Sequence, residues 1–252
     1  MQILKPIKLP VNAAQPYIIN ANNLVAGYGT KTVIRNLFFN LPQASFLAVT
    51  GSNGSGKTTL FRLLTGTLPY SGSLQVNGSE LSGSAELKYR FPVAGLPQKS
   101  DLNFSMPVRD LVVTGLFRHK KLFESYSHAD FMLADAALES MGIGALSQSD
   151  FTQLSGGQQQ LAWLAQLLVQ KSRLMVLDEP AQYLDLFNRR LIFNHMFNWV
   201  NQGMSVVCIT HDLQYLENRE GYLLHLDNEH TIFEKISSSL LAEVRHRLEY
   251  NS

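Results

Sequence analysis

Residues 51–59, which spell Gly-Ser-Asn-Gly-Ser-Gly-Lys-Thr-Thr, constrain the fold of this chain more than any other stretch. They match the pattern G-x-x-x-x-G-K-[ST] of a phosphate-binding loop. The apolar residues 46–50 before the loop predict a short buried strand, and residues 57–64 after it predict a helix. This strand–loop–helix context is the one that the motif requires.

The residue types in this loop suit the binding of phosphate and of a divalent cation. Gly51, Gly54 and Gly56 let the backbone N–H groups turn inward, and the N-terminus of the following helix adds a positive dipole. Lys57 can reach the outer phosphates, and the hydroxyl of Thr58 can ligate Mg²⁺. The alternative is an ordinary glycine turn, but a chain with ordinary glycine content matches this pattern by chance only about once in a hundred.

Length and composition indicate a globular protein of one large or two small domains in 252 residues. The net charge of +1 gives no basic excess for nucleic acid. The single Cys208 lies in an apolar run, where a buried and inert thiol is expected. No apolar run reaches the ~18 residues of a membrane span, and prolines interrupt the N-terminus. We therefore expect a cytoplasmic protein.

The flanks of the chain are predicted to be rich in strands and its middle third to be helical. The predicted strands are residues 18–25, 33–41, 72–78, 91–96, 174–177, 204–209 and 222–226, with a turn at 27–30 and a polar connection at 79–88. The predicted helices are residues 107–117, 128–141, 186–201, 212–218 and 237–250. Apolar strands that alternate with helices in the last third indicate a parallel sheet with helices on its faces.

Asp178 and Glu179 follow the apolar strand at 174–177. Ligands of parallel sheets collect beyond the carboxyl ends of the strands, where the phosphate loop also lies. Asp178 would there hold Mg²⁺, and Glu179 would polarise a water that attacks the γ-phosphate. The alternative is a charged strand end that is capped by Pro180.

Three further features have a functional and a structural interpretation. Ser155 in the sequence Leu-Ser-Gly-Gly-Gln at 154–158 would offer an anion its hydroxyl and free helix N–H groups, or it would simply cap the helix. His211 follows another apolar strand and would contact a phosphate or start a helix. Tyr28, between Gly27 and Gly29, would present its ring or pack on the sheet.

In order and spacing, these motifs together with Gln98 resemble the ATP-binding cassette (ABC) family from about residue 18 to the 230s. The resemblance implies an α/β fold with a P-loop NTPase (RecA-like) core, an antiparallel β edge and a helical subdomain. Residues 1–252 would form a single ABC ATPase domain. Residues 1–16 would be an N-terminal arm, 17–98 and 169–252 the core, and 99–168 the helical subdomain that carries the signature motif.

The resemblance assigns roles residue by residue. Tyr28 would stack on adenine, Asp185 would belong to the D-loop, and Gln98 would sense Mg²⁺ and the partner subunit. The implied ATP contacts are Tyr28, Gly51, Ser52, Asn53, Gly54, Ser55, Gly56, Lys57, Thr58, Thr59, Ser155, Gly156, Gly157 and Gln158. The implied catalytic residues are Glu179, His211, Lys57 and Gln98, and the implied Mg²⁺ ligands are Thr58, Gln98 and Asp178.

The resemblance also implies partners. In this family two cassettes form a homodimer that buries two ATP molecules, and Ser155 and Gly157 would contact the nucleotide of the other copy. Separate membrane permeases would carry the transported substrate, and an extracytoplasmic binding protein would act indirectly. The cassette would then lie on the cytoplasmic face of the cell membrane. Phe104, Phe117 and Phe123 would receive a permease helix, or they would pack in the core.

Residues 97–115 resemble cassettes of zinc/manganese and iron-chelate importers, so we expect uptake of a metal ion or metal chelate, with zinc or manganese favoured. Iron-siderophore, haem or cobalamin uptake is the alternative. A soluble ABC ATPase is a rival, although the chain has neither a second cassette nor a long coiled coil. A non-hydrolysing module is another, although Lys57 and Glu179 are intact. Leu161 and Gln166 depart from the family, which commonly has arginines there.

Overall fold

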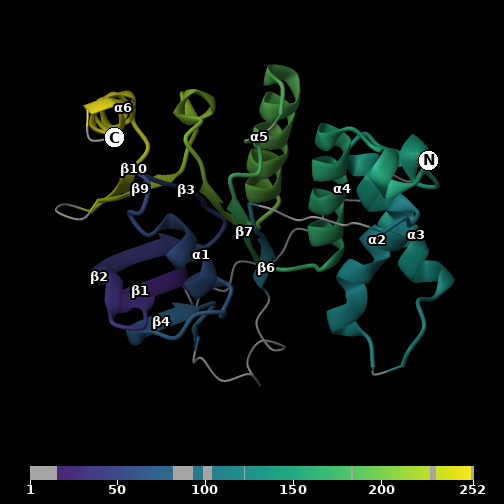
Figure 1. Cartoon of the computed structure of the whole chain (residues 1–252), viewed down its shortest axis with the longest axis horizontal. Helices are drawn as coiled ribbons and strands as arrows, with labels where there is room; N and C mark the ends of the chain where they lie inside the picture. Colours follow the sequence, from purple (N-terminus) through teal and green to yellow (C-terminus); the bar gives the residue numbers. More distant parts are fainter. Residues whose placement is uncertain are drawn as a thin grey trace.

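The strands form two sheets that lie on either side of helix α1 (Lys57–Leu64) in the computed structural model of the chain (Figure 1). The structure describes residues 16–81, 93–98, 104–121, 123–182, 184–227 and 231–250. The apolar side of α1, which includes Leu60 and Leu64, packs against both sheets. The phosphate loop is therefore held at the junction of the two sheets.

The larger sheet has six strands in the order β10-β9-β3-β8-β7-β6. The strands from β9 to β6 run parallel, and only β10 at the edge is antiparallel. Every residue of β3, β7 and β8 is buried, as expected for apolar strands with both faces covered. The strands are β3 (Phe46–Gly51), β6 (Val93–Leu96), β7 (Leu174–Asp178), β8 (Ser205–Ile209), β9 (Tyr222–Leu226) and β10 (Ile232–Lys235).

The smaller sheet is antiparallel and has four strands in the order β2-β1-β4-β5. One face is buried against α1 and the larger sheet, through residues such as Leu24, Phe39 and Leu74. Its strands are β1 (Tyr17–Tyr28), β2 (Lys31–Pro42), β4 (Ser71–Val76) and β5 (Ser79–Glu80).

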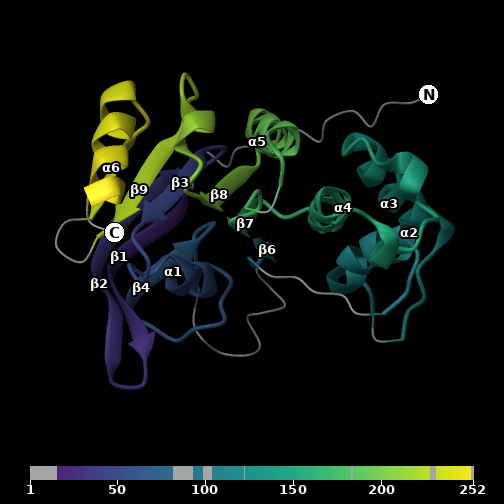
Figure 2. The same cartoon turned by 45° about the horizontal axis from the view of Figure 1, so that its top comes forward.

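Helices cover the other face of the larger sheet and form a separate group at one end of the molecule (Figure 2). α5 (Leu186–Asn201) and α6 (Ser238–Tyr250) lie over the face opposite α1. α2 (Val108–Val113), α3 (His128–Ser140) and α4 (Gly156–Val169) pack on one another beyond β6. Short 3₁₀ segments complete the chain at η2 (Thr114–His119), η3 (Gly144–Leu146), η4 (Phe151–Gln153) and η5 (Leu213–Leu216).

This topology places the carboxyl ends of β3, β7 and β8 at one edge of the sheet. β3 and β8 are in register at Val49 and Ile209, and β7 and β8 at Asp178 and Ile209. The segments that follow each strand therefore start side by side, and they carry the phosphate loop, Glu179 and His211. Neighbouring parallel strands thus bring together residues far apart in the sequence.

The α/β fold class with an antiparallel β edge and a helical part is confirmed. Several boundaries were wrong. β1 runs through Tyr28, so the predicted turn at 27–30 shrinks to Gly29 and Thr30. Ser79–Glu80 pairs with β4 because it continues a hairpin, whereas we expected an unpaired connection. The rest of that connection, residues 82–88, lies outside the described residues, as do residues 91 and 92 of the predicted strand at 91–96 and residues 1–15 of the predicted arm.

Two predicted helices were wrong, and one strand was not predicted. The short helix expected at 212–218 is the four-residue 3₁₀ segment η5. Such a short segment forms i→i+3 hydrogen bonds in place of the α-helical pattern. The strand β10 was not predicted, because it is four residues long and only Ile232 and Phe233 are apolar. The helix expected at 107–117 is the six-residue α2 followed by η2. Among the described residues, none of the helices has the length and apolar composition that crossing a membrane requires.

Candidate active site

The phosphate loop begins at Gly51 and ends at the first turn of α1. Gly51 has φ 153°, and a Cβ atom there would lie 2.4 Å from Leu226 O and from Ser55 Oγ. Gly56 precedes α1 with φ 107°, and no side chain caps the helix. Because a capping side chain is missing, the first N–H groups of α1 remain available to an anion at the loop.

Lys57 holds its ammonium group inside the loop. Its Nζ donates to Gly51 O at 2.7 Å and to Ser52 O at 2.9 Å, and the residue is 8% exposed. Burial lowers the pKa of this amine, and the carboxylates of Glu179 and Asp178 oppose that effect. An ammonium group has three donors, so one remains for an anionic ligand. The loop therefore fits a phosphate group.

Asp178 lies at the end of β7 and is 4% exposed. Burial raises its pKa to about 6, with a further contribution from the Glu179 carboxylate, while Lys57 acts in the opposite direction. A divalent cation would relieve this accumulation of negative charge. No group of three or more His, Cys, Asp or Glu side chains arranged for metal binding occurs in the described part of the chain. One carboxylate with the exposed Thr58 hydroxyl fits Mg²⁺, which retains waters and phosphate oxygens as its other ligands.

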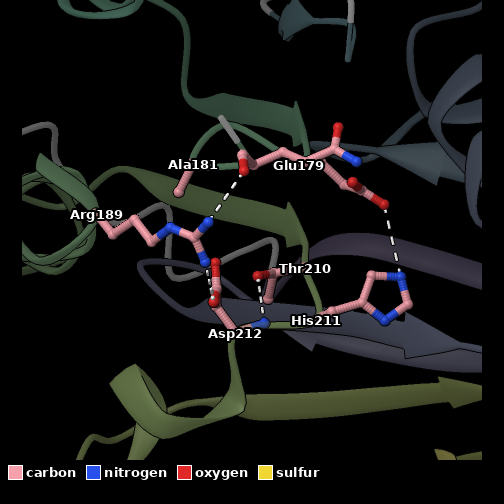
Figure 3. Close-up of a pocket in the computed structure, with 7 residues that line it drawn as sticks. Glu179, Ala181, Arg189, Thr210, His211 and Asp212 are labelled. Carbon is pink, nitrogen blue, oxygen red and sulfur yellow. Dashed lines mark hydrogen bonds and ion pairs between the residues drawn. The ribbon is translucent and has the colours of Figure 1, made fainter. Parts of the chain in front are cut away.

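Glu179 lies between two other residues for which a catalytic role is expected. Gln98 Nε2 donates to Glu179 Oε2 at 3.2 Å. On the other side, His211 Nε2 lies 3.5 Å from Glu179 Oε1 (Figure 3). Burial, and secondarily Lys57, lowers the pKa of His211, so a neutral imidazole faces the carboxylate. The structure thus brings Glu179, Gln98 and His211 together at the edge of the sheet.

The backbone of Glu179 is in a left-handed conformation with φ 50°. This conformation is unfavourable for a residue with a side chain, by about 1 kcal/mol. Its N–H donates to Ile209 O at 3.0 Å, which fixes the turn against β8. Beside it lies a cavity of about 210 Å³ (Figure 3). Its lining residues are Glu179, Ala181, Gln182, Arg189, Thr210, His211 and Asp212.

The segment at 154–158 has a different character. Ser155 Oγ accepts a bond from the Gln158 N–H at 3.3 Å, and Gln158 Oε1 accepts one from the Ser155 N–H at 3.0 Å. This reciprocal capping box is the structural interpretation of Ser155. Ser155 and Gly156 are exposed, and α4 lies apart from α1 in both views (Figures 1 and 2). Within one molecule, the segment is therefore remote from the phosphate loop.

Comparison with known proteins places these features in a family. A family model described as ABC transporter matches residues 34–182. The chain belongs to the ABC transporter family. As a member, it is an ATP-binding cassette with ATPase activity.

Similar proteins cover most of this cassette. The ferric enterobactin transport ATP-binding protein of Escherichia coli is 30% identical, over 82% of this chain and 78% of that protein. A protein of Chlamydia trachomatis named probable metal transport system ATP-binding protein is 29% identical, over 84% and 81%. A solved inward-facing structure of a putative metal-chelate type ABC transporter has 28% identity and a TM-score of 0.78, over 91% of this chain and 89% of that chain.

Tyr28 of this cassette lies at the end of β1 and is 41% exposed. The guanidinium of Arg62, on α1, lies 5.5 Å from the centre of its ring. The ring is thus presented at the surface and does not pack into the sheet, as the structural alternative required. One face contacts a cation, and stacking on adenine by the other face stays a prediction.

The two departures from the family sequence have local explanations. Leu161 is buried among the side chains of the helical group. Gln166 Nε2 donates to Thr114 Oγ1 at 3.1 Å, so its amide joins α4 to η2. Packing and a neutral hydrogen bond therefore occupy the positions where arginines are common.

Three residues of the cassette site were not predicted from the sequence. Gln182 Oε1 accepts a bond from Gln98 Nε2 at 2.8 Å, and Arg189 contacts both Gln182 and Asp212. The spacing of Arg189, four residues after Asp185, places both on one side of α5, and Asp212 follows His211 directly. These spacings were the available signals, but they do not reveal which groups meet.

Proposed function

We propose that this cassette hydrolyses ATP as one half of a homodimer and drives uptake of a metal ion or metal chelate through separate membrane permeases. The observation that carries the proposal is the asymmetry within one chain. Glu179, Gln98 and His211 are assembled beside the phosphate loop, while the segment at 154–158 faces outward. An outward signature is expected if it completes the site of another copy.

In the proposed mechanism, the loop N–H groups and Lys57 hold the phosphates of ATP. Asp178, Thr58 and Gln98 would hold Mg²⁺, which when bound neutralises charge on the phosphate oxygens. Glu179 accepts a hydrogen bond from the attacking water and orients it, and Gln98 fixes the carboxylate through its 3.2 Å bond. His211 remains neutral because of its lowered pKa and donates a hydrogen bond to the γ-phosphate. The reaction proceeds by positioning and charge stabilisation.

The second copy supplies Ser155 and Gly157. The capping box uses Ser155 Oγ as an acceptor, so its hydroxyl proton remains available to a phosphate of the facing subunit. The Gly157 N–H and the positive dipole at the N-terminus of α4 would contact the same phosphate. Two such sites related by a twofold axis would bury two nucleotides.

Permease docking would use the exposed aromatic residues of the helical group. Phe104 is 60%, Phe117 63% and Phe123 96% exposed. Core packing, the alternative for these three residues, does not account for such exposure. We therefore propose that they contact a permease on the cytoplasmic face of the membrane, with an extracytoplasmic binding protein acting only through that permease. No role in binding nucleic acid is proposed, since the net charge is +1.

The class of transported substrate is proposed from the relatives. One of them is named for metal transport and another for ferric enterobactin transport. Both names belong to the class of metal ions and metal chelates. The choice of zinc or manganese over an iron chelate stays a prediction, because the cassette itself does not touch the transported substrate.

The variant Glu179→Gln tests the hydrolytic role. It keeps the size of the side chain and removes the base, so turnover should fall by roughly 100-fold or more. ATP should then shift the variant to a dimer in size-exclusion chromatography, while wild-type protein returns to monomer as ATP is consumed. Near-normal turnover would remove Glu179 from this role. A variant that stays monomeric with ATP would contradict the dimer.

Transport is tested by copurification and uptake. The tagged cassette should copurify with a membrane permease, and cells that lack the cassette should lose uptake of one radiolabelled substrate among zinc, manganese and an iron chelate. Reintroducing wild-type protein should restore uptake, and Glu179→Gln should not. Copurification with ribosomes and unchanged uptake of all three would favour a soluble ABC ATPase.

A further inference from the structure

Arg189 makes three hydrogen bonds to two separate parts of the active site, and Figure 3 shows its contact with Asp212. Its Nε donates to Leu184 O at 2.8 Å and its Nη2 to Gln182 O at 3.0 Å. Its Nη1 donates to Asp212 Oδ1 at 3.0 Å. The guanidinium thus joins the α5 lead-in, by which we mean Gln182, Leu184 and Asp185, to the residue that follows His211.

Each end of this connection reaches a proposed catalytic group. At one end, Gln182 Oε1 accepts the bond from Gln98 Nε2 at 2.8 Å, and Gln98 also contacts Glu179. At the other end, the N–H of Asp212 donates to the buried Thr210 Oγ1 at 3.0 Å, which fixes the corner that carries His211. Since His211 contacts Glu179, the contacts form a closed ring around the cavity.

The chemistry of this position is specific to arginine. A planar guanidinium donates in fixed directions, so three acceptors in two separate segments are held in one geometry. The Arg189 side chain is 28% exposed and that of Asp212 15%, so their ion pair is partly shielded from water. A lysine keeps the charge, but its single nitrogen cannot satisfy acceptors spread along a guanidinium plane.

We propose that Arg189 is a positioning residue that couples the α5 lead-in to the corner at His211. This inference rests on the proposed roles of Glu179 and His211. Asp185, in the lead-in, caps α5 with its side chain and is exposed at the surface, where a second copy would contact it. A displacement of the lead-in is therefore transmitted through Arg189 to His211, and the two parts of the site change position together.

The test compares Arg189→Ala and Arg189→Lys with the matched control Arg190→Ala, which removes the adjacent and exposed arginine of the same helix. Loss of positioning should lower kcat by roughly 10- to 100-fold in Arg189→Ala, with an intermediate loss in Arg189→Lys. KM for ATP and the affinity for a fluorescent nucleotide should stay within about twofold, since the phosphate loop is unchanged. Arg190→Ala should keep wild-type kcat.

Hydrogen exchange gives a readout independent of turnover. Amides of Leu184, Asp185 and Asp212 should exchange faster in Arg189→Ala, while those of α1 should not change. A lower melting temperature with normal kcat for the folded fraction would mean a structural role only and would overturn the proposal. Equal changes in KM and kcat would overturn it as well.

Asp212→Asn cuts the same connection from its other end and covers the case in which Arg189→Ala fails to fold. The double variant Arg189→Ala/Asp212→Asn should be no slower than the slower single variant, because both remove one link. Independent, multiplying losses would overturn the coupling. Glu179→Gln is measured in parallel: if it retains turnover, the proposed function fails, whereas if only Arg189→Ala retains turnover, this inference alone fails.

Discussion

The phosphate loop and the segment at 154–158 differ in where their polar groups find partners. Lys57 is buried and bonded to two loop carbonyls, and Glu179 contacts both Gln98 and His211. In the segment at 154–158, the side chains of Ser155 and Gln158 each accept a bond from the other residue's backbone N–H at an exposed helix start. The first region is organised by contacts across the fold, and the second by contacts within four residues.

This difference has a consequence for each region's sensitivity to mutation. Groups held by long-range contacts lose their geometry when a distant element moves, whereas a local cap keeps its geometry as long as its helix exists. The first region is therefore suited to chemistry in its own subunit. The second presents a preformed surface that needs nothing from its own subunit's loop, as a half-site completed by another copy requires.

The largest expected effect is on nucleotide affinity, which should depend on the phosphate loop and not on the segment at 154–158 of the same chain. Lys57→Met removes the charged donor while keeping an apolar chain of similar length. Loss of a hydrogen bond to a charged group costs about 1.5–3 kcal/mol, so the nucleotide Kd should rise by roughly 10- to 100-fold. Ser155→Asp, measured by the same fluorescent-nucleotide titration of the monomer, should bind like wild type. Equal loss in both variants would break the comparison.

A smaller effect tests whether Ser155 does more than cap α4. Asp caps a helix as well as Ser does, so Ser155→Asp should keep the melting temperature. Its negative charge would face the phosphates of the other copy, so kcat should fall by at least roughly tenfold. The neutral cap in Ser155→Asn is the control and should retain more activity. If Ser155→Asp keeps wild-type kcat, Ser155 is a cap and nothing further.

Mixing two defective variants tests the half-site directly. In a mixed dimer of Lys57→Met and Ser155→Asp, one site combines the intact loop of one copy with the intact outward segment of the other. Since half of randomly paired dimers are mixed and each has one good site of two, an equimolar mixture should recover about a quarter of wild-type ATPase activity. Activity no greater than the average of the two variants would contradict completion in trans.

The architecture followed from local signals wherever a segment was apolar and regular. β7 and β8 are short apolar runs between helices, and the prediction of a parallel sheet was confirmed. α1 spans Lys57–Leu64 as the motif and its apolar spacing predicted. Boundaries were missed where pairing decides the conformation, as at Ser79–Glu80, because a two-residue strand exists only through its partner.

The site was predictable for residue identity and not for connectivity. Gln98 and Glu179 are 81 residues apart, and their 3.2 Å contact depends on the order of β6 and β7 in the sheet. Arg189 and Asp212 meet because the start of α5 lies beside the end of β8, which no local spacing encodes. Motifs therefore identify the groups, while the residues that position them emerge only from the packed fold.

The smallest expected effect uses the titration of His211, since residues 154–158 contain no ionisable side chain. Burial and Lys57 lower the pKa of His211 below its usual 6.5. As pH falls, His211 is therefore protonated at a higher pH in the unfolded chain than in the folded protein. The free energy of unfolding then decreases as pH drops through 6.5 toward the folded pKa. His211→Gln should remove this pH-dependent contribution to stability. Between pH 7 and pH 5 its melting temperature should therefore fall by about 1 °C less than that of wild type. The difference is small because the ring is half-exposed. Ser155→Asn should follow the wild-type pH dependence, and the other histidines, shared by all three proteins, cancel. An identical decline in His211→Gln would show that this ring titrates alike in the folded and unfolded chain, and the lowered pKa of His211 would then be contradicted.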